Sequence, residues 1–302
     1  MKKNRWGNVS PGAAFVLNVI AILFSALCLL PFLLIISISF TDELTVLREG
    51  YQFIPKVFST EAYRFLFMNA DLVGNAYKIT ILVTLVGTAI NVMIIAMYAY
   101  PLSRSDFPYK RFFTVFILIL MLFNGGFVAQ YLINVRVLHL RNNFWALILP
   151  SLGGGFYVFV TRTFFQKTIP TEVIESAKID GAGELRIFRK IVLPLSLPIL
   201  AVNALMNVFL FWNNWMNSLY YITTPKLYTL QFVMQQALRD MQLMKTMISG
   251  GAAEAAQSIT NTMPAETARM AMVIVGIGPI IAVYPFFQRY FVKGLTVGAV
   301  KG

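Results

Sequence analysis

The sequence predicts an all-α, polytopic membrane protein with six transmembrane helices and both termini in the cytoplasm. Three observations predict this fold class. Of the 302 residues, 58% are hydrophobic and only 13% are charged, whereas soluble domains carry roughly a quarter charged residues. The apolar residues gather in six runs, each near the roughly 20 residues that cross a bilayer as a helix. The basic residues gather on one side of those runs.

The first apolar run covers residues 13–40 and follows a short basic segment, Lys2 to Arg5. That order also suits a secretory signal peptide. However, the run is longer than the roughly 7–15 apolar residues of a signal peptide, and no small-residue cleavage site precedes Asp42. We therefore predict a retained first transmembrane helix, kinked at Pro31.

The other five spans are expected at residues 73–100, 112–131, 144–165, 191–215 and 271–291. The connections 41–72 and 216–270 are longer, and we expect short helices or interfacial segments there. Gly153 to Gly155, in the fourth run, favour close helix packing over a local break.

Charge sets the orientation of the spans. Six spans place both termini on one side, and 15 of the 25 basic residues fall on that side, which nets +10 against +2 opposite. Basic residues are retained in cytoplasmic loops, so both termini are predicted to be cytoplasmic. The same bias accounts for the formal net charge of +12 without nucleic-acid binding.

Several functions are disfavoured by what the chain lacks. It has one cysteine, Cys28, and one histidine, His139, so neither a disulfide nor a histidine-built metal site is expected. The predicted spans hold no acid, so we expect no enzymatic centre there, and a proton-coupled mechanism is weakened. A self-contained secondary transporter coupled to sodium through carbonyls and hydroxyls stays open as an alternative, although no internal repeat supports it.

The segment between the fourth and fifth spans, residues 168–194, reads as two short cytoplasmic helices. Pro170 suits a first helical turn, and Glu172 favours the positive end of the helix dipole. Gly181, after Asp180, ends the first helix because glycine adopts the left-handed conformation readily. The pattern alone leaves open an ordinary amphipathic loop that lies on the membrane.

The residues in this loop resemble a family signature. Glu-Ala-Ala, three residues, Gly, nine residues, Ile, one residue and Leu-Pro define the EAA loop of ABC-importer permeases. The chain matches it at Glu175, Ala177, Gly181, Ile191, Leu193 and Pro194. Ser176 is the one departure, because alanine usually stands there, and serine is small enough to preserve close packing.

Other segments resemble the carbohydrate-uptake branch of the family. They are Tyr98–Arg104, Asp180–Ala182, the tail Tyr284–Gly302, which is similar to that of the second, MalG-like permease, and Phe123–Tyr131, which is similar to the oligosaccharide subgroup. The resemblance implies one permease domain over 1–302, with its core at about 73–292, in the bacterial cytoplasmic (inner) membrane. A permease for a non-sugar solute remains an alternative.

The resemblance also implies partners. A homologous second permease completes the pathway, two cytoplasmic ABC ATPase subunits bind the loops, and an extracytoplasmic solute-binding protein delivers a carbohydrate. The expected ATPase-coupling residues are Glu175, Ser176, Ala177, Asp180, Gly181 and Ala182. The chain has no G-x-x-x-x-G-K-[ST] phosphate loop, so ATP and Mg are expected on the partner ATPase and no cofactor on this chain.

Amide and aromatic side chains along the second half of the fifth span suit a sugar, which offers hydroxyls and flat faces. These candidate pathway residues are Asn203, Asn207, Trp212, Asn213, Asn214 and Trp215. The alternative is that the tryptophans form the outer aromatic belt and that the amides bond neighbouring helices.

Overall fold

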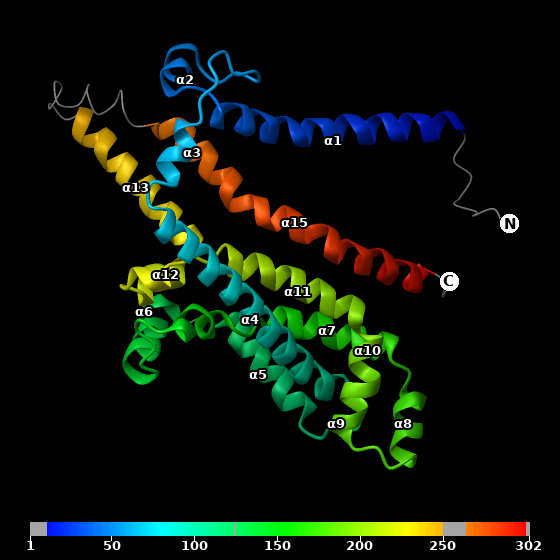
Figure 1. Cartoon of the computed structure of the whole chain (residues 1–302). Helices are drawn as coiled ribbons and strands as arrows, with labels where there is room; N and C mark the ends of the chain where they lie inside the picture. Colours follow the sequence, from blue (N-terminus) through cyan, green and yellow to red (C-terminus); the bar gives the residue numbers. More distant parts are fainter. Residues whose placement is uncertain (1–10, 124, 250–263, 300–302) are drawn as a thin grey trace. The chain divides into compact units, whose positions relative to one another are not determined.

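The computed structural model describes residues 11–123, 125–249 and 264–299, and these residues form helices and turns without a β-strand (Figure 1). The all-α fold class is therefore confirmed. The chain divides into two compact units, residues 1–69 with 238–277 and residues 70–237 with 278–302.

The first unit begins with α1, Pro11–Ser39, which continues as one helix through Pro31. Its apolar side chains are exposed along nearly the whole length, and only the last three residues are buried. A helix that is apolar on all sides without protein cover suits a lipid environment. Two short helices follow, α2 at Glu43–Glu49 and α3 at Glu61–Leu66.

The same unit contains the start of α15, Ala265–Ala299, and the end of α13, Leu230–Ser249. A carboxylate from α2 caps α15. Glu43 Oε1 accepts from the Glu266 backbone N–H at 2.9 Å, and Oε2 accepts from the N–H and the hydroxyl of Thr267 at 2.9 and 2.7 Å. These bonds satisfy N–H groups that a helix start leaves without intrahelical acceptors, and the negative charge favours the helix dipole.

The second unit is built on three helices that pack side by side, α4, α7 and α11 (Figure 1). Their bounds are Ala70–Ser103, Gly155–Thr168 and Leu197–Trp212. Gly87 lets α4 and α11 approach closely, because a Cβ at this position would lie 2.7 Å from the ring of Phe211. Small residues at such contacts are typical of membrane helices.

Shorter elements complete the second unit. They are α5 (Lys110–Leu122), α6 (Gly126–Leu132), η1 (Ile133–Val137), η2 (Phe144–Leu147), η3 (Leu149–Ser151), α8 (Thr171–Ile179), α9 (Glu184–Ile187), η4 (Phe188–Val192), α10 (Leu193–Leu195), α12 (Met216–Tyr221) and η5 (Pro225–Leu227). Of these, η1 and η4 are π-helical, and η2, η3 and η5 are 3₁₀ turns.

The expected spans correspond to two kinds of element. The first two are continuous helices, α1 and α4, that are long and apolar enough to cross a membrane. The next three are bent pairs. The run 112–131 turns by 111° between α5 and α6, and the run 144–165 turns by 60° before α7. Up to five spans follow by length and composition among the described residues. The sixth run lies within α15 and is not counted among these five. The number of six spans, and the side of the membrane on which the termini lie, therefore stay predictions.

The expectation that Gly153 to Gly155 favour packing over a break is wrong for the first two glycines. Gly153 and Gly154 have positive φ angles of 104° and 119°, which interrupt the helix. Gly155 does make a close contact, since a Cβ there would lie 2.5 Å from Met121. The stretch therefore combines a left-handed break with close packing, and glycine serves both uses.

The fifth run also breaks, with an 80° bend between the helical segment 184–195 and α11. Two prolines explain the position. Pro194 has no N–H to continue the i→i−4 pattern, and the preceding η4 is π-helical. Pro198 stands in the first turn of α11, after Ser196. A proline in a helix removes a hydrogen bond and crowds the carbonyl four residues earlier, so one straight span from 191 to 215 does not form.

Candidate functional site

The first loop helix, α8, ends in a fixed turn. The Gly181 N–H donates to Lys178 O at 3.0 Å, and the Ala182 N–H donates to Ala177 O at 2.9 Å. Gly181 has φ +76°, as the sequence predicted. This pair of bonds around a left-handed residue is the Schellman motif. The small residues of the loop signature therefore build a defined helix end. At the other end, Pro170 precedes the helix as its N-cap, one position earlier than expected.

One face of the loop packs on the helix bundle. Ile174 is buried, and Ala177 and Ala182 pack against a cluster that contains Ile187 and Phe188. The remaining expected coupling residues, Glu175, Ser176, Asp180 and Gly181, are exposed. The expected coupling residues thus contribute their two alanines to the bundle and present the other four outward.

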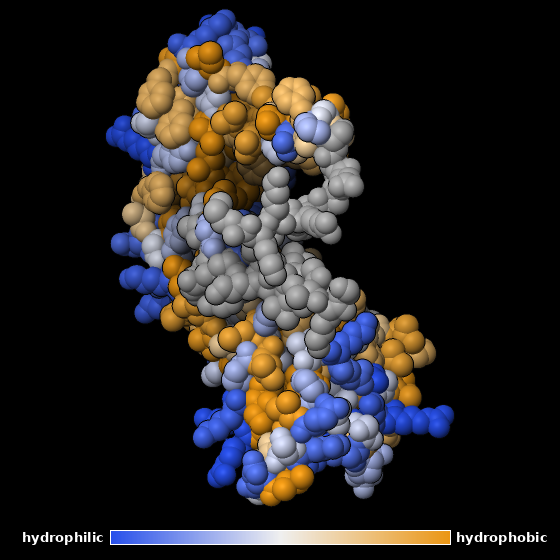
Figure 2. All heavy atoms as spheres, turned by 90° about the vertical axis from the view of Figure 1, so that its right-hand side faces the viewer, coloured by the Kyte–Doolittle hydropathy of each residue, from blue (hydrophilic) through white to orange (hydrophobic). Residues whose placement is uncertain are grey.

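The outward surface of the loop is partly apolar. Ile179 is 87% exposed, Leu185 66% and Val173 39%. Beside Leu185 a shallow groove is lined by two glycines, Gly181 and Gly183, and by bases, Arg186, Arg189 and Lys190. Figure 2 shows hydrophobic and hydrophilic side chains intermingled at this end of the unit. Large exposed aliphatic side chains next to charges mark a surface that fits a protein partner.

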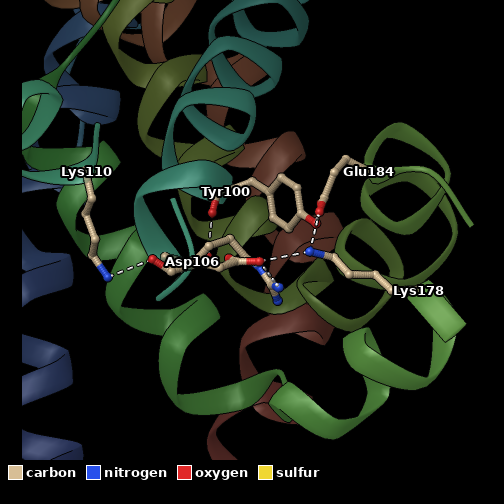
Figure 3. A network of polar contacts seen from close by, with 7 residues as sticks. Tyr100, Asp106, Lys110, Lys178 and Glu184 are labelled. Atoms are coloured by element: carbon tan, nitrogen blue, oxygen red, sulfur yellow. Dashed lines mark hydrogen bonds and ion pairs between the residues drawn. The ribbon is translucent and has the colours of Figure 1, made fainter. Parts of the chain in front are cut away.

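A network of polar contacts connects the loop with α4 and the segment that follows it (Figure 3). Lys178 Nζ lies 2.9 Å from Asp106 Oδ2 and 2.7 Å from Glu184 Oε1. The Tyr100 hydroxyl donates to Glu184 Oε2, and the Arg104 guanidinium donates to both oxygens of Asp106 at 3.1 Å. Four elements, α4, the 104–109 segment, α8 and α9, are joined through five side chains.

The charges in the network hold one another ionised. Hydrogen bonds from Lys178 and then Arg104 keep the pKa of Asp106 well below its usual range. Burial acts to raise the pKa of Glu184, but the bonds from Lys178 and Tyr100 outweigh it, so this pKa is also lowered. The two carboxylates, Glu184 first, raise the pKa of Lys178. Opposite charges within about 4–6 Å favour the charged forms of both partners.

Two of the expected pathway residues, Asn203 and Asn207, lie buried between helices. Asn203 Nδ2 donates to Thr161 Oγ1 at 2.8 Å, and Asn207 Nδ2 donates to the Asn203 carbonyl at 2.8 Å. Asn91 Nδ2 donates to Asn207 Oδ1, and Asn91 Oδ1 accepts from the Gly153 N–H at 2.8 Å. These amides connect α4, α7 and α11 and satisfy the backbone at the break before α7. We call them the buried amide network.

The other expected pathway residues lie at the end of α11. Trp212 is buried in a cluster with Ala76 and Leu230. Asn213 is exposed and donates to Phe209 O, while Asn214 is half-buried and donates to Ser151 Oγ at 2.8 Å. Trp215 is half-buried. The six residues therefore do not form one site: two lie inside the bundle, one in an apolar cluster and three at the helix end.

Sequence reasoning missed the side chains that complete both networks. Asn91 is the buried partner of Asn207. The sequence did indicate such a contact, because an amide side chain in an apolar run needs a hydrogen-bond partner. Asp106 and Lys178 were not singled out, since exposed charges give no indication of their partners. The hydroxyl of the buried Tyr100 was not singled out either. Among the residues that the structure describes, no three His, Cys, Asp or Glu side chains gather as metal ligands.

Named relatives are similar to nearly the whole chain. The Bacillus subtilis (strain 168) polygalacturonan/rhamnogalacturonan transport system permease protein YtcP is 35% identical over 281 residues, 93% of this chain and 95% of that protein. Protein LplC of the same organism is 35% identical over 300 residues, 98% and 97% of the two chains. The arabinooligosaccharides transport system permease protein AraQ of Halalkalibacterium halodurans is 28% identical over 97% of this chain and 98% of that protein.

A solved structure shares the fold. A chain of a bacterial ABC transporter involved in the import of the acidic polysaccharide alginate matches 94% of this chain and 99% of its own length, with 26% identity and a TM-score of 0.76. The family model for the inner membrane component of binding-protein-dependent transport systems matches residues 89–297, which include α7, α11 and the whole loop. The chain therefore belongs to the inner-membrane permeases of binding-protein-dependent ABC importers.

Proposed function

We propose that this permease forms half of the membrane pathway for an oligosaccharide. A homologous second permease supplies the other half, two cytoplasmic ATPase subunits drive transport, and an extracytoplasmic solute-binding protein delivers the sugar. The support is that relatives matched over more than nine-tenths of the chain are named for polygalacturonan, rhamnogalacturonan and arabinooligosaccharides. The matched solved structure belongs to an importer of alginate.

The proposal assigns energy coupling to the loop 168–194. The observation that carries it is the exposed apolar surface at Val173, Ile179 and Leu185, around a Schellman turn of fixed geometry. Apolar surface gains roughly 25 cal/mol per Å² when it is removed from water, so a partner that covers these side chains is stabilised on the loop. The neighbouring bases Arg186 and Arg189 favour a partner surface that carries acids.

The proposal divides the amides between two roles. Asn203 and Asn207 hold the helices together, because their side chains are buried and bonded across the bundle. Asn213, Asn214 and Trp215 keep free surface at the end of α11, and we assign them contact with sugar hydroxyls and ring faces. Aromatic side chains with a small number of polar groups are the usual lining of small-molecule sites, where the polar groups fix the orientation of the ligand.

Site-specific cross-linking tests the docking. In the full transporter, after Cys28 is replaced by serine, single cysteines at Ile179 and Leu185 are expected to cross-link to the ATPase subunit. A cysteine at Lys167, which is exposed on α7, serves as the matched control and is expected to stay unlinked. Equal labelling at all three positions, or none at Ile179, would contradict docking on this surface.

Uptake into proteoliposomes tests the substrate. Oligogalacturonides, neutral arabinooligosaccharides and a non-sugar solute such as a dipeptide are each offered with the cognate binding protein. We expect ATP-dependent uptake of an oligosaccharide and none of the dipeptide. Uptake of the dipeptide alone would show that the substrate is not a sugar. It would not contradict the role proposed for the coupling loop.

A further inference from the structure

The coupling helix α8 is held to the bundle by few apolar contacts. Its nine residues include one that is fully buried, Ile174. Ala177 adds a half-buried methyl group, and the other side chains are exposed. A single buried isoleucine holds the helix against the bundle by removing its apolar surface from water, but one contact point does not fix the tilt or the rotation of a helix. Something else must set the direction of α8.

The polar network supplies the missing constraint. Lys178, on α8, contacts Asp106 and Glu184 at the same time, and these acids stand on two different segments. An ammonium group held at 2.9 and 2.7 Å from two separate oxygens has its position defined from two directions. Figure 3 shows Lys178 reaching between the two carboxylates.

At the α4 side of the network, the side chains of Arg104 and Tyr100 are held by their own burial and contacts. Arg104 has a side chain only 10% exposed, and its carbonyl accepts from Lys110 Nζ at 2.9 Å. Tyr100 is 8% exposed and its ring lies 5.3 Å from that of Phe188, centre to centre. Tyr100 lies in the last turn of α4, and Arg104 follows the helix directly. The network thus joins a lightly anchored helix to a well-packed one.

From these contacts we propose that Lys178 positions the coupling helix and delivers its movement to α4. The proposal rests on the proposed docking of the ATPase to the same loop. When the ATPase displaces α8, the displacement passes through Lys178 to Asp106 and Glu184, and from these to Arg104 and Tyr100. Because α4 is one continuous helix, it transmits the movement from Tyr100 to Asn91, nine residues earlier and about 14 Å along the axis, and so to the buried amide network.

The exposure of the ions separates this role from a purely stabilising one. The side chains of Lys178, Asp106 and Glu184 are 37%, 52% and 54% exposed. Ion pairs in contact with water contribute little to stability. Loss of Lys178 should therefore leave the fold intact. The two carboxylates would lose the cation between them, and the orientation of α8 would no longer be fixed.

The experiment compares Lys178→Gln, Lys178→Arg and Tyr100→Phe in the full transporter, with Lys167→Gln as the control. Sugar molecules transported per ATP hydrolysed are measured in proteoliposomes. Lys178→Gln is expected to lower this ratio about fivefold, the low end of coupling effects. Lys178→Arg should restore most of it, because a guanidinium can also donate to two carboxylates. Tyr100→Phe should lower it less, and Lys167→Gln should match the wild type.

A distance measurement reports position directly. Spin labels at two exposed sites, Ser105 beside the network and Glu172 on α8, are expected to give a narrow distance distribution in the wild type and a broad one in Lys178→Gln. An unchanged transport ratio with a narrow distribution would overturn the proposal. If Lys178→Gln does not assemble, Tyr100→Phe decides, because it keeps the ring packing: a wild-type ratio there refutes the proposal, and a lowered ratio supports it. Failure of ATPase docking would appear separately, as loss of the Ile179 cross-link in the wild type.

Discussion

Two polar networks in this permease solve different problems. The buried amide network, around Asn91, Asn203 and Asn207, is at most 1% exposed and uncharged. The network around Lys178 is partly exposed and fully charged. Neutral amides can be buried where each finds a partner, whereas buried charges are costly even in pairs. The first network therefore holds α4, α7 and α11 in register, and the second sets a direction at the surface.

The comparison shows which property of the protein depends on each kind of bond. Removal of a buried partner leaves another polar group without water or protein to bond. Removal of an exposed partner lets water take its place. Stability should thus depend on the amides, and energy coupling should depend on the charges. The predictions below separate the two dependences.

The largest effect on stability is expected for Asn91→Leu. This change removes the partner of Asn207 Oδ1, which is buried, and of the Gly153 N–H, in a half-buried residue. The cost is about 3 kcal/mol for the two groups together. Thermal unfolding of the purified transporter measures the loss. Asn213→Leu is the control, because that side chain is exposed. Equal unfolding temperatures for the two variants would show that the buried amides do not hold the bundle.

The next largest effect is expected for Gly181→Ala against Gly183→Ala. Neither glycine has an atom within 4 Å of an added Cβ, but Gly181 has φ +76° and Gly183 has φ −70°. A side chain in the left-handed region costs about 1–2 kcal/mol, so only Gly181→Ala should loosen the end of α8. Substrate-stimulated ATPase activity and uptake should fall for this variant alone. Larger side chains such as Gly181→Leu should do more harm, since the ATPase must also fit there.

A smaller effect is expected for Glu175→Gln. The side chain is exposed, and an exposed substitution usually changes stability by less than about 0.5 kcal/mol. Uptake and ATPase activity should stay closer to the wild type than in Gly181→Ala. A collapse of ATPase docking in Glu175→Gln would instead place a direct charged contact with the ATPase at this position.

No effect is expected from pH within the neutral range. The lowered pKa values of Asp106 and Glu184 keep their contribution in place above their ordinary values of 3.8 and 4.5, with loss only on strong acidification. The raised pKa of Lys178 keeps its contribution in place below 10.5, with loss in strong alkali. The defect of Lys178→Gln relative to the wild type should thus be equal at about pH 6 and about pH 9. A defect that disappears at either pH would show that another group titrates with the network.

The loop was the part most open to prediction from sequence. The local pattern predicted the first helix and the left-handed Gly181, because both depend on residues close together in the chain. The span boundaries were less accurate where Gly153, Gly154, Pro194 and Pro198 interrupt apolar runs. The hydrophobicity of a run shows whether it is long enough to cross a membrane. It does not show whether the helix is continuous or bent. One of the two alternatives for the amides, that they bond neighbouring helices, is confirmed for Asn203 and Asn207. The partners could not be predicted, since Asn91 meets Asn207 and Asp106 meets Lys178 only after the chain folds.

The carboxylate of Glu43 on the start of α15 has a consequence for biogenesis. The two bonded segments are separated by 223 and 224 positions along the chain, so Glu43 leaves the ribosome long before Thr267. The cap cannot close until Glu266 and Thr267 have been synthesised. A chain that stops before them leaves the carboxylate of Glu43 without these donors. The bonds therefore join the two stretches of the first unit only late in translation.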